Sequence, residues 1–152
     1  MPARRALPDE HHVMRYMSAS KRFVDENGQR LGPSAAGFKL RADDKGGLSV
    51  TEIEHFGAFD LASIRDGAVA FRESQEKKQL GKNAIFAWAK IADAKSAAYS
   101  YSKKIRVVHD PVAGNPGHAE IRQFDDDDLD LLDYFSSGVF TKYQTVGDLD
   151  LP

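Results

Sequence analysis

The spacing of apolar residues in the first third of the chain indicates short strands. Residues 13–17 favour extended structure. In residues 37–41, Phe38 and Leu40 alternate with polar neighbours and fall on one face of a second predicted strand. A third strand runs from Leu48 to about His55, and the turn-forming residues 43–47 before it predict a hairpin with the second strand.

From Asp60 onward the apolar period lengthens to three and four residues, which predicts an amphipathic helix. Asp60 is suited to cap its start by accepting a backbone N–H bond, and Gly81 is suited to end it. Gly67 inside this helix costs about 1 kcal/mol relative to alanine. Packing around Gly67 therefore either tolerates the loss or requires a residue without a side chain.

The second half of the chain changes repeatedly between strand and helix patterns. Residues 85–88 favour a strand, and the alanine-rich residues after them favour a helix to about Tyr99. Strands at 104–109 and 119–124 flank a loop rich in proline and glycine, which predicts a second hairpin. An amphipathic helix follows at 129–139, and the four aspartates at 125–128 suit its N-terminal dipole. Residues 144–152 are expected to fray, and residues 1–8 are expected to form a loose arm.

These elements predict one α+β domain that spans residues 1–152. The sheet is expected to be mixed but mainly antiparallel, because hairpin-like strand pairs occur without a regular βαβ alternation. Two principal amphipathic helices are expected to pack on one face of this sheet.

Composition narrows the class of protein. The apolar share of 41% and the charged share of 29% are those of an ordinary globular protein. Cysteine is absent, which excludes disulfides and thiolate metal sites, and no stretch approaches the ~18 apolar residues of a membrane span. We therefore expect a cytoplasmic protein. The net charge of −2 supplies no field for nucleic acid or membranes, so a protein partner or self-association are the partners to consider.

Polar residues are densest between Asp9 and Tyr16. Adjacent side chains of a strand point to opposite faces, so His12 is expected to lie with Tyr16, and His11 with Arg15. In a functional interpretation, one histidine is a general base or metal ligand, Arg15 grips an anion and Tyr16 contributes to binding. In the simpler interpretation, both histidines lie on the surface at the start of an edge strand.

A second polar cluster flanks the predicted loop at 111–117. If the hairpin brings His109 and His118 together, Asp110 adds an oxygen ligand to two nitrogens, a set suited to zinc or another divalent ion. A further ligand would have to come from another histidine. The alternative is that Asp110 and Asn115 bond backbone amides and shape the loop.

His55 follows Glu52 and Glu54 in the sequence. A histidine–carboxylate dyad for proton transfer can be imagined there. A lone histidine at a strand end is more often structural, and the sequence contains neither a G-x-G-x-x-G motif nor a P-loop.

Several segments in combination resemble a group of small uncharacterised bacterial proteins. They are residues 7–16, 37–41, 48–51, 108–111 and 115–119. The resemblance implies a bacterial, cytosolic protein that stands alone, and it transfers no catalytic residue.

Two functions remain open at this point. The absence of a complete catalytic motif favours a non-enzymatic accessory or protein-interaction module. The alternative is a small histidine-dependent hydrolase or phosphoester-binding enzyme, with or without a metal, whose catalytic group is His12, Arg15, His109 and His118. The two readings differ in whether distant polar segments meet when the chain folds.

Overall fold

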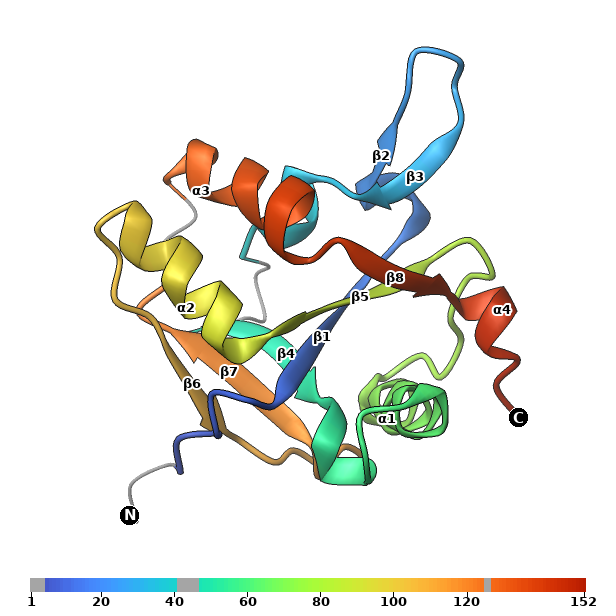
Figure 1. Ribbon diagram of the computed structural model, residues 1–152. Coiled ribbons are helices and arrows are strands. Elements are labelled where there is room, and N and C mark those ends of the chain that lie inside the picture. The colour runs from blue at the N-terminus through green and yellow to red at the C-terminus, as the bar shows by residue number, and fades with distance from the viewer. Residues whose placement is uncertain (1–4, 41–46, 125–126) are drawn as a thin grey trace.

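Six strands form one antiparallel sheet in the computed structural model, which describes residues 5–40, 47–124 and 127–152 (Figure 1). Their order across the sheet is β6 (Arg106–His109), β7 (His118–Arg122), β4 (Leu48–Glu52), β1 (His12–Met17), β5 (Ile85–Lys90) and β8 (Lys142–Thr145). Every pairing between these strands is antiparallel. The predicted α+β class is confirmed.

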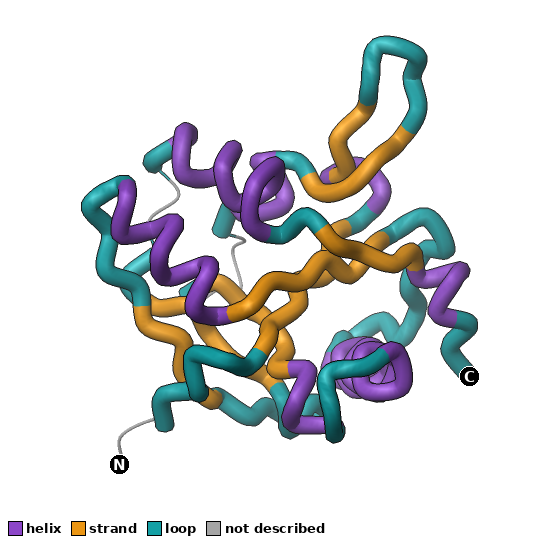
Figure 2. The backbone as a smooth tube through the Cα atoms, viewed as in Figure 1, coloured by secondary structure: helices purple, strands orange, loops and turns teal. Residues whose placement is uncertain are grey.

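Helices cover both faces of this sheet (Figure 2). Helices α2 (Ile91–Ser100) and α3 (Leu129–Tyr134) lie on one face, here the α2 face, while α1 (Leu61–Ser74) and α4 (Val146–Leu149) lie on the other, the α1 face. The expectation that the principal helices share one face is wrong. The central strands are apolar on both sides, since Val13 packs into the core of the α2 face and Met14 into that of the α1 face.

Helix α1 begins as predicted and ends early. The carboxylate of Asp60 accepts a hydrogen bond from the backbone N–H of Ser63 at 2.9 Å, so the predicted cap is confirmed. The helix ends at Ser74, and Gly81 lies beyond it in a loop. Gly67 is required by close packing, because a Cβ there would lie 2.7 Å from Cε of Met14.

The segment before β4 differs most from the prediction. Residues 37–40 form no strand; the 3₁₀ turn η2 (Ala35–Phe38) instead places Phe38 in the core. β4 pairs with β1 and β7, so the predicted first hairpin is wrong. The hairpin in this region lies earlier, between β2 (Arg22–Val24) and β3 (Arg30–Pro33), and follows the 3₁₀ turn η1 (Ala19–Lys21). Residues 41–46, which hold most of the predicted turn, lie outside the described residues.

Local patterns predict the middle of the chain well. The change from strand to helix after Trp88 is confirmed by β5 and α2, which meet between Lys90 and Ile91. The hairpin of β6 and β7 is confirmed. The last long helix begins at Leu129, where the carboxylate of Asp128 caps it, and continues through a π turn, η4 (Phe135–Val139). Two of the four aspartates, at 125–126, lie outside the described residues.

Both ends of the described chain are ordered against the sheet. The Leu7 side chain is buried, and its backbone N–H bonds to Val107 at 3.0 Å, so residues 5–7 extend the sheet beside β6. β8 and α4 replace the predicted frayed tail, with Val146 and Leu149 buried. Both predictions of loose ends are wrong where the structure describes them, because each segment buries apolar side chains. None of the described helices is long and apolar enough to cross a membrane.

Candidate functional site

One end of the sheet gathers all five histidines of the chain. His11 and His12 lie at the start of β1, His55 lies in the 3₁₀ turn η3 (Ile53–Phe56) after β4, and His109 and His118 lie at the adjoining ends of β6 and β7. The two polar clusters of the sequence therefore lie on either side of β4 and η3, about 10 Å apart across two strand spacings. We call this region the histidine end.

Two neighbouring histidines each contact a carboxylate. Nδ1 of His11 lies 2.7 Å from Oε2 of Glu52, and Nδ1 of His12 lies 2.7 Å from Oε2 of Glu54. The other carboxylate oxygen of Glu54 accepts the backbone N–H of His12 at 2.7 Å. Glu54 therefore holds both the ring and the backbone of His12, which fixes the orientation of the imidazole.

These contacts define where the ring protons lie. A carboxylate or carbonyl oxygen only accepts hydrogen bonds, so Nδ1 of His11 and His12 carries the proton in each neutral ring. The same holds for His118, whose Nδ1 donates to the backbone oxygen of Asp110 at 2.7 Å. Nε2 of all three rings then carries a lone pair, and none of these three atoms has a hydrogen-bond partner among the described residues.

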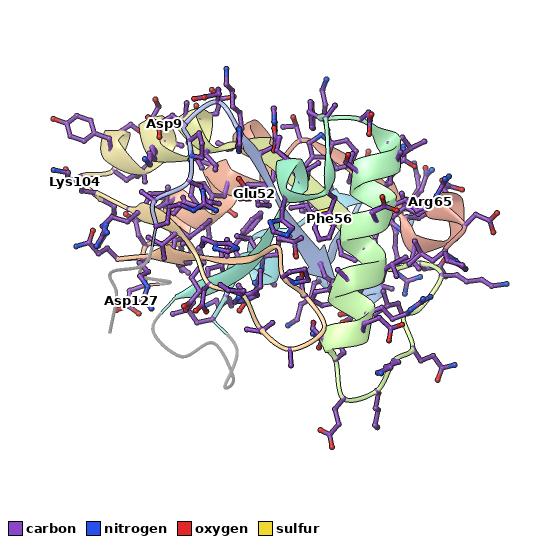
Figure 3. The ribbon with its side chains drawn as sticks, turned by 90° about the horizontal axis from the view of Figure 1, so that it is seen from below. Asp9, Glu52, Phe56, Arg65, Lys104 and Asp127 are labelled. Carbon is purple, nitrogen blue, oxygen red and sulfur yellow. The ribbon has the colours of Figure 1, made fainter. Side chains whose placement is uncertain are left out.

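The carboxylates are more buried than the imidazoles they hold. The side chain of Glu52 is 4% exposed and that of its partner His11 is 32% exposed. The ring of Phe59 covers one face of the His12 ring, with centroids 3.6 Å apart and planes 3° from parallel. Figure 3 looks onto this region and places Phe56 of η3 between Glu52 and helix α1. The His11 imidazole therefore stays within reach of solvent while Glu52 is shielded from it, whereas His12 and Glu54 are both mostly buried, at 18% and 13% exposed.

The hairpin loop completes the histidine end. Nε2 of His109 donates to the backbone oxygen of Pro116 at 2.9 Å, and its ring lies 5.7 Å from that of His55. Asn115 is fully buried: its amide nitrogen donates to Oγ1 of Thr51 at 3.0 Å, and its amide oxygen accepts the backbone N–H of Gly117 at 3.1 Å. Asn115 thus shapes the loop and ties it to β4.

His12 and His118 share a face of the sheet. Met14 lies opposite Thr51, and Thr51 lies opposite His118, so these three side chains point to the α1 face. His12 lies two residues before Met14 and points the same way. Both side chains therefore lie on the side of the sheet on which α1 packs.

Two predicted site residues lie elsewhere. Arg15 points to the α2 face, is 3% exposed, and donates to the backbone oxygens of Gly37, Ser49 and Lys39 at 2.6, 2.8 and 3.2 Å. Tyr16 lies four residues beyond His12 and stacks on Phe71 at 4.9 Å. The expectation that Arg15 joins the histidines is wrong, because it lies on the opposite face from His12 and its guanidinium supports backbone carbonyls.

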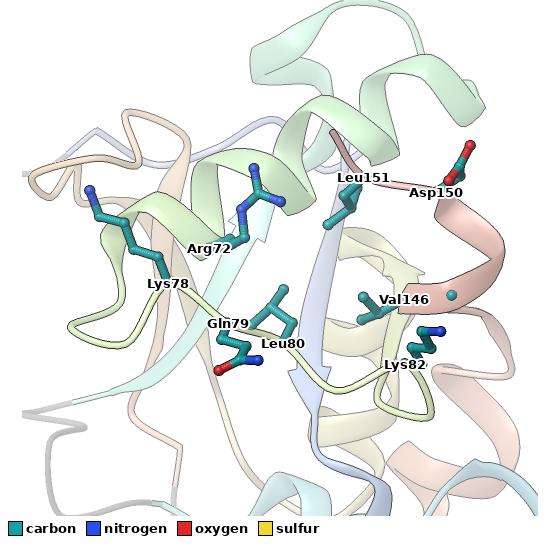
Figure 4. Close-up of a pocket in the computed structure, with 9 residues that line it drawn as sticks. Arg72, Lys78, Gln79, Leu80, Lys82, Val146, Asp150 and Leu151 are labelled. Atoms are coloured by element: carbon teal, nitrogen blue, oxygen red, sulfur yellow. The ribbon is translucent and has the colours of Figure 1, made fainter.

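Cations line a cavity at another place in the fold. A space of about 300 Å³ lies between the end of α1, the loop after it and α4, and includes Arg72, Lys78 and Lys82 in its wall (Figure 4). Arg72 donates to the backbone oxygen of Pro152 at 2.7 Å, and Lys78 pairs with Glu73 at 3.2 Å. These contacts occupy much of the positive charge, and the cavity does not supply the anion grip expected of Arg15.

The predicted metal ligands do not assemble into a complete set. His118 lies 3.5 Å from Oδ2 of Asp110, but Nε2 of His109 is bonded to a backbone oxygen. Across the described residues, no group of three or more histidine or carboxylate side chains is placed to hold a metal ion. No metal is therefore assigned a role at the histidine end.

Sequence reasoning missed the partners of the first two histidines. The sequence suggests His55, their neighbour in the chain, as the partner of Glu52 and Glu54, whereas the fold pairs them with His11 and His12. The spacing of two between the carboxylates, at the end of a strand, is the sequence feature that points to them, but only strand pairing reveals which histidines they contact.

Comparison of this chain with protein families, curated proteins and solved structures finds no match.

Proposed function

We propose that the histidine end is the active site of a small histidine-dependent hydrolase that acts on a neutral acyl substrate, an ester or an amide. The observation that carries the proposal is the 2.7 Å contact between Nδ1 of His12 and Glu54, which leaves Nε2 of an oriented ring without a partner among the described residues. A base held in this way by a carboxylate is the arrangement that proton transfer requires.

The proposed reaction needs no nucleophile from the protein. Nε2 of His12 takes a proton from water while the water oxygen forms a bond to the acyl carbon and the carbonyl π pair moves onto the carbonyl oxygen. That pair then re-forms the C=O bond as the bond from the carbon to the leaving group breaks, and the proton passes from Nε2 to the leaving group. The Glu54 carboxylate stabilises the imidazolium between these steps. In the proposed reaction His118, which faces the same side across Thr51, contacts the substrate from the other flank.

The charge around the site supports a neutral substrate over a phosphoester. Three carboxylates lie at the histidine end, on Glu52, Glu54 and Asp110, and the arginine expected to hold an anion points to the other face. A phosphate would approach these carboxylates, and the cation opposite His12 in the sheet, Lys90, is exposed and therefore offsets the repulsion only weakly. Cleavage of a neutral ester meets no such barrier.

The test uses two chromogenic probes, p-nitrophenyl acetate and bis(p-nitrophenyl) phosphate. We expect saturable cleavage of the acetate, faster than by free imidazole at equal concentration, and no cleavage of the phosphate. His12→Gln should lower kcat about 100-fold, as expected for loss of a general base. Glu54→Gln should lower kcat and leave KM unchanged, because Glu54 positions His12 without touching the substrate.

Glu76→Gln, in the loop after α1, is the matched control and should behave as the unsubstituted protein. Circular dichroism confirms that each variant is folded, since the His12–Glu54 contact also ties β1 to η3. Wild-type rates in His12→Gln would overturn the proposal.

A protein-interaction module is the second candidate function, and a different feature favours it. An apolar groove lies beside the β2–β3 hairpin. This hairpin lies at the far end of β1 from the histidines (Figure 1). An interaction role at that groove is compatible with chemistry at the histidine end, because the two sites use different residues.

A further inference from the structure

The groove beside the hairpin has the size of a ligand site. It encloses about 760 Å³ between β3, β8 and the α3–η4 helix. Most of its wall is apolar, with Phe23, Leu31, Pro33 and Tyr143 contributing side chains. Phe23 is 52% exposed although it is a large aromatic residue. An exposed aromatic beside an apolar hollow is a common feature of surfaces that bind another molecule.

The wall is closely packed where the hairpin meets the sheet. A Cβ at Gly32 would lie 3.0 Å from the ring of Tyr143, so β3 packs directly on that ring. Arg22 lies over the opposite strand of the hairpin, donates to the backbone oxygen of Leu31 at 2.6 Å and sits 5.7 Å from the Tyr143 ring centroid. These contacts fix the position of the hairpin against β8 on one side of the groove.

The polar atoms of the α3–η4 wall are acceptors. Asp133 is the only charged residue in the lining, is exposed, and forms no ion pair within the described residues. The hydroxyls of Ser136 and Ser137 both donate to the backbone oxygen of Asp133, at 2.9 and 2.8 Å. Each hydroxyl has one proton, so the oxygens that remain toward the groove can only accept.

The direction of the α3–η4 helix also favours a cation at this wall of the groove. Asp133, Ser136 and Ser137 lie toward the C-terminal end of α3–η4, where the helix dipole is negative. A carboxylate, two acceptor hydroxyls and a negative helix end together favour a cationic donor over an anion.

We propose that this groove docks a segment of another protein that presents an apolar side chain next to a lysine or arginine. The apolar side chain fills the hollow against Phe23 and Tyr143, and the cation reaches Asp133 and the two hydroxyls. This inference specifies the partner of the interaction role and does not depend on the histidine end.

The test compares two peptides that differ in one charge. The probes are acetyl-Leu-Phe-Arg-Leu-amide and acetyl-Leu-Phe-Glu-Leu-amide, and binding is followed by ¹H–¹⁵N shifts of the labelled protein. We expect shifts at the amides of Gly32, Ser137 and Thr141, and binding of the arginine peptide about tenfold tighter than that of the glutamate peptide.

Two substitutions separate the contribution of the Asp133 charge from that of the apolar Phe23 side chain. Asp133→Asn should remove the difference between the peptides, while Asp66→Asn on the exposed side of α1, which packs on the other face of the sheet, should keep it. Phe23→Ala should weaken both peptides equally, and because Phe23 is exposed this change leaves the fold intact.

Equal affinity of the two peptides would overturn the charge requirement and leave an interaction role standing. No shift at any groove amide with either peptide would overturn both. Sedimentation of the protein alone addresses self-association: a dimer abolished by Phe23→Ala would place a second copy of the chain in the groove and overturn the proposed partner.

Discussion

Arg15 shows how this fold uses a buried charge. Its guanidinium donates to three backbone oxygens, two of them in the segment around η2 and one in β4. Gly37 and Lys39 lie outside the sheet, and Ser49 lies beyond the part of β4 that pairs with β1. The carbonyls of these residues therefore rely on the Arg15 side chain for hydrogen bonds. The residue type suits this task because its donors form a planar fork that spans several acceptors.

Replacing Arg15 with methionine therefore tests a structural role against an anion-binding one. The change keeps much of the apolar stem but leaves buried carbonyls without donors, and should cost about 2–4 kcal/mol. Urea unfolding measures this, with the exposed Arg106→Met of β6 as control. Unchanged stability with lost hydrolysis would assign Arg15 to the reaction instead.

Asn115 is a second residue whose role follows from burial. Substitution by alanine removes its bonds to Thr51 and to the backbone of Gly117, leaving a buried N–H unpaired. We expect a loss of about 1–3 kcal/mol in the free energy of unfolding. Asn83→Ala, at an exposed position, is the comparison and should change little. An equal loss in both variants would contradict the account.

At the scale of elements, the sequence predicts what depends on neighbours in the chain. The Asp60 cap, the change from β5 to α2 and the β6–β7 hairpin all follow from residues within a few positions of one another. The pairing of β4 with β1 could not be predicted, because strand partners are set by packing between distant segments. The chemistry of histidine identifies these residues as candidates from the sequence alone. Which carboxylates they contact depends on the same long-range strand pairing.

The C-terminal elements show that tertiary contacts can also order a segment whose local sequence pattern favours disorder. Residues 144–152 are short and carry few apolar positions, so the pattern favours a frayed end. In the fold, β8 pairs with β5, and α4 places Leu149 in the core of the α1 face. Burial of a few side chains outweighs the weak local preference.

Leu149→Ala tests whether this end is part of the core. Truncating a fully buried leucine should lower the free energy of unfolding by about 2–5 kcal/mol. Leu129→Ala removes the same atoms from a side chain that is 58% exposed and should cost far less. Thermal or urea unfolding compares the two. If both changes had the same small effect, the C-terminal segment would contribute little to the fold.

At the scale of the whole molecule, the two core clusters share one sheet. Alternate residues of β1 and β5 point into opposite cores, so neither core can form without the strands that also line the other. We therefore expect residues 1–152 to unfold as one cooperative unit.

The single tryptophan allows the cooperativity of unfolding to be measured. Trp88 packs against the core of the α1 face, so its fluorescence reports that side, while far-UV circular dichroism reports all elements. The two signals should give the same midpoint in urea. An earlier midpoint by fluorescence would mean that the layer of α1 and α4 opens separately.

The gathering of every imidazole at one end of the sheet also gives the molecule a natural spectroscopic label. Resonances of histidine side chains in a uniformly labelled sample arise from that region and from nowhere else. Tautomer, ring exchange and contact with an added compound can thus be observed there directly, without introducing a reporter group.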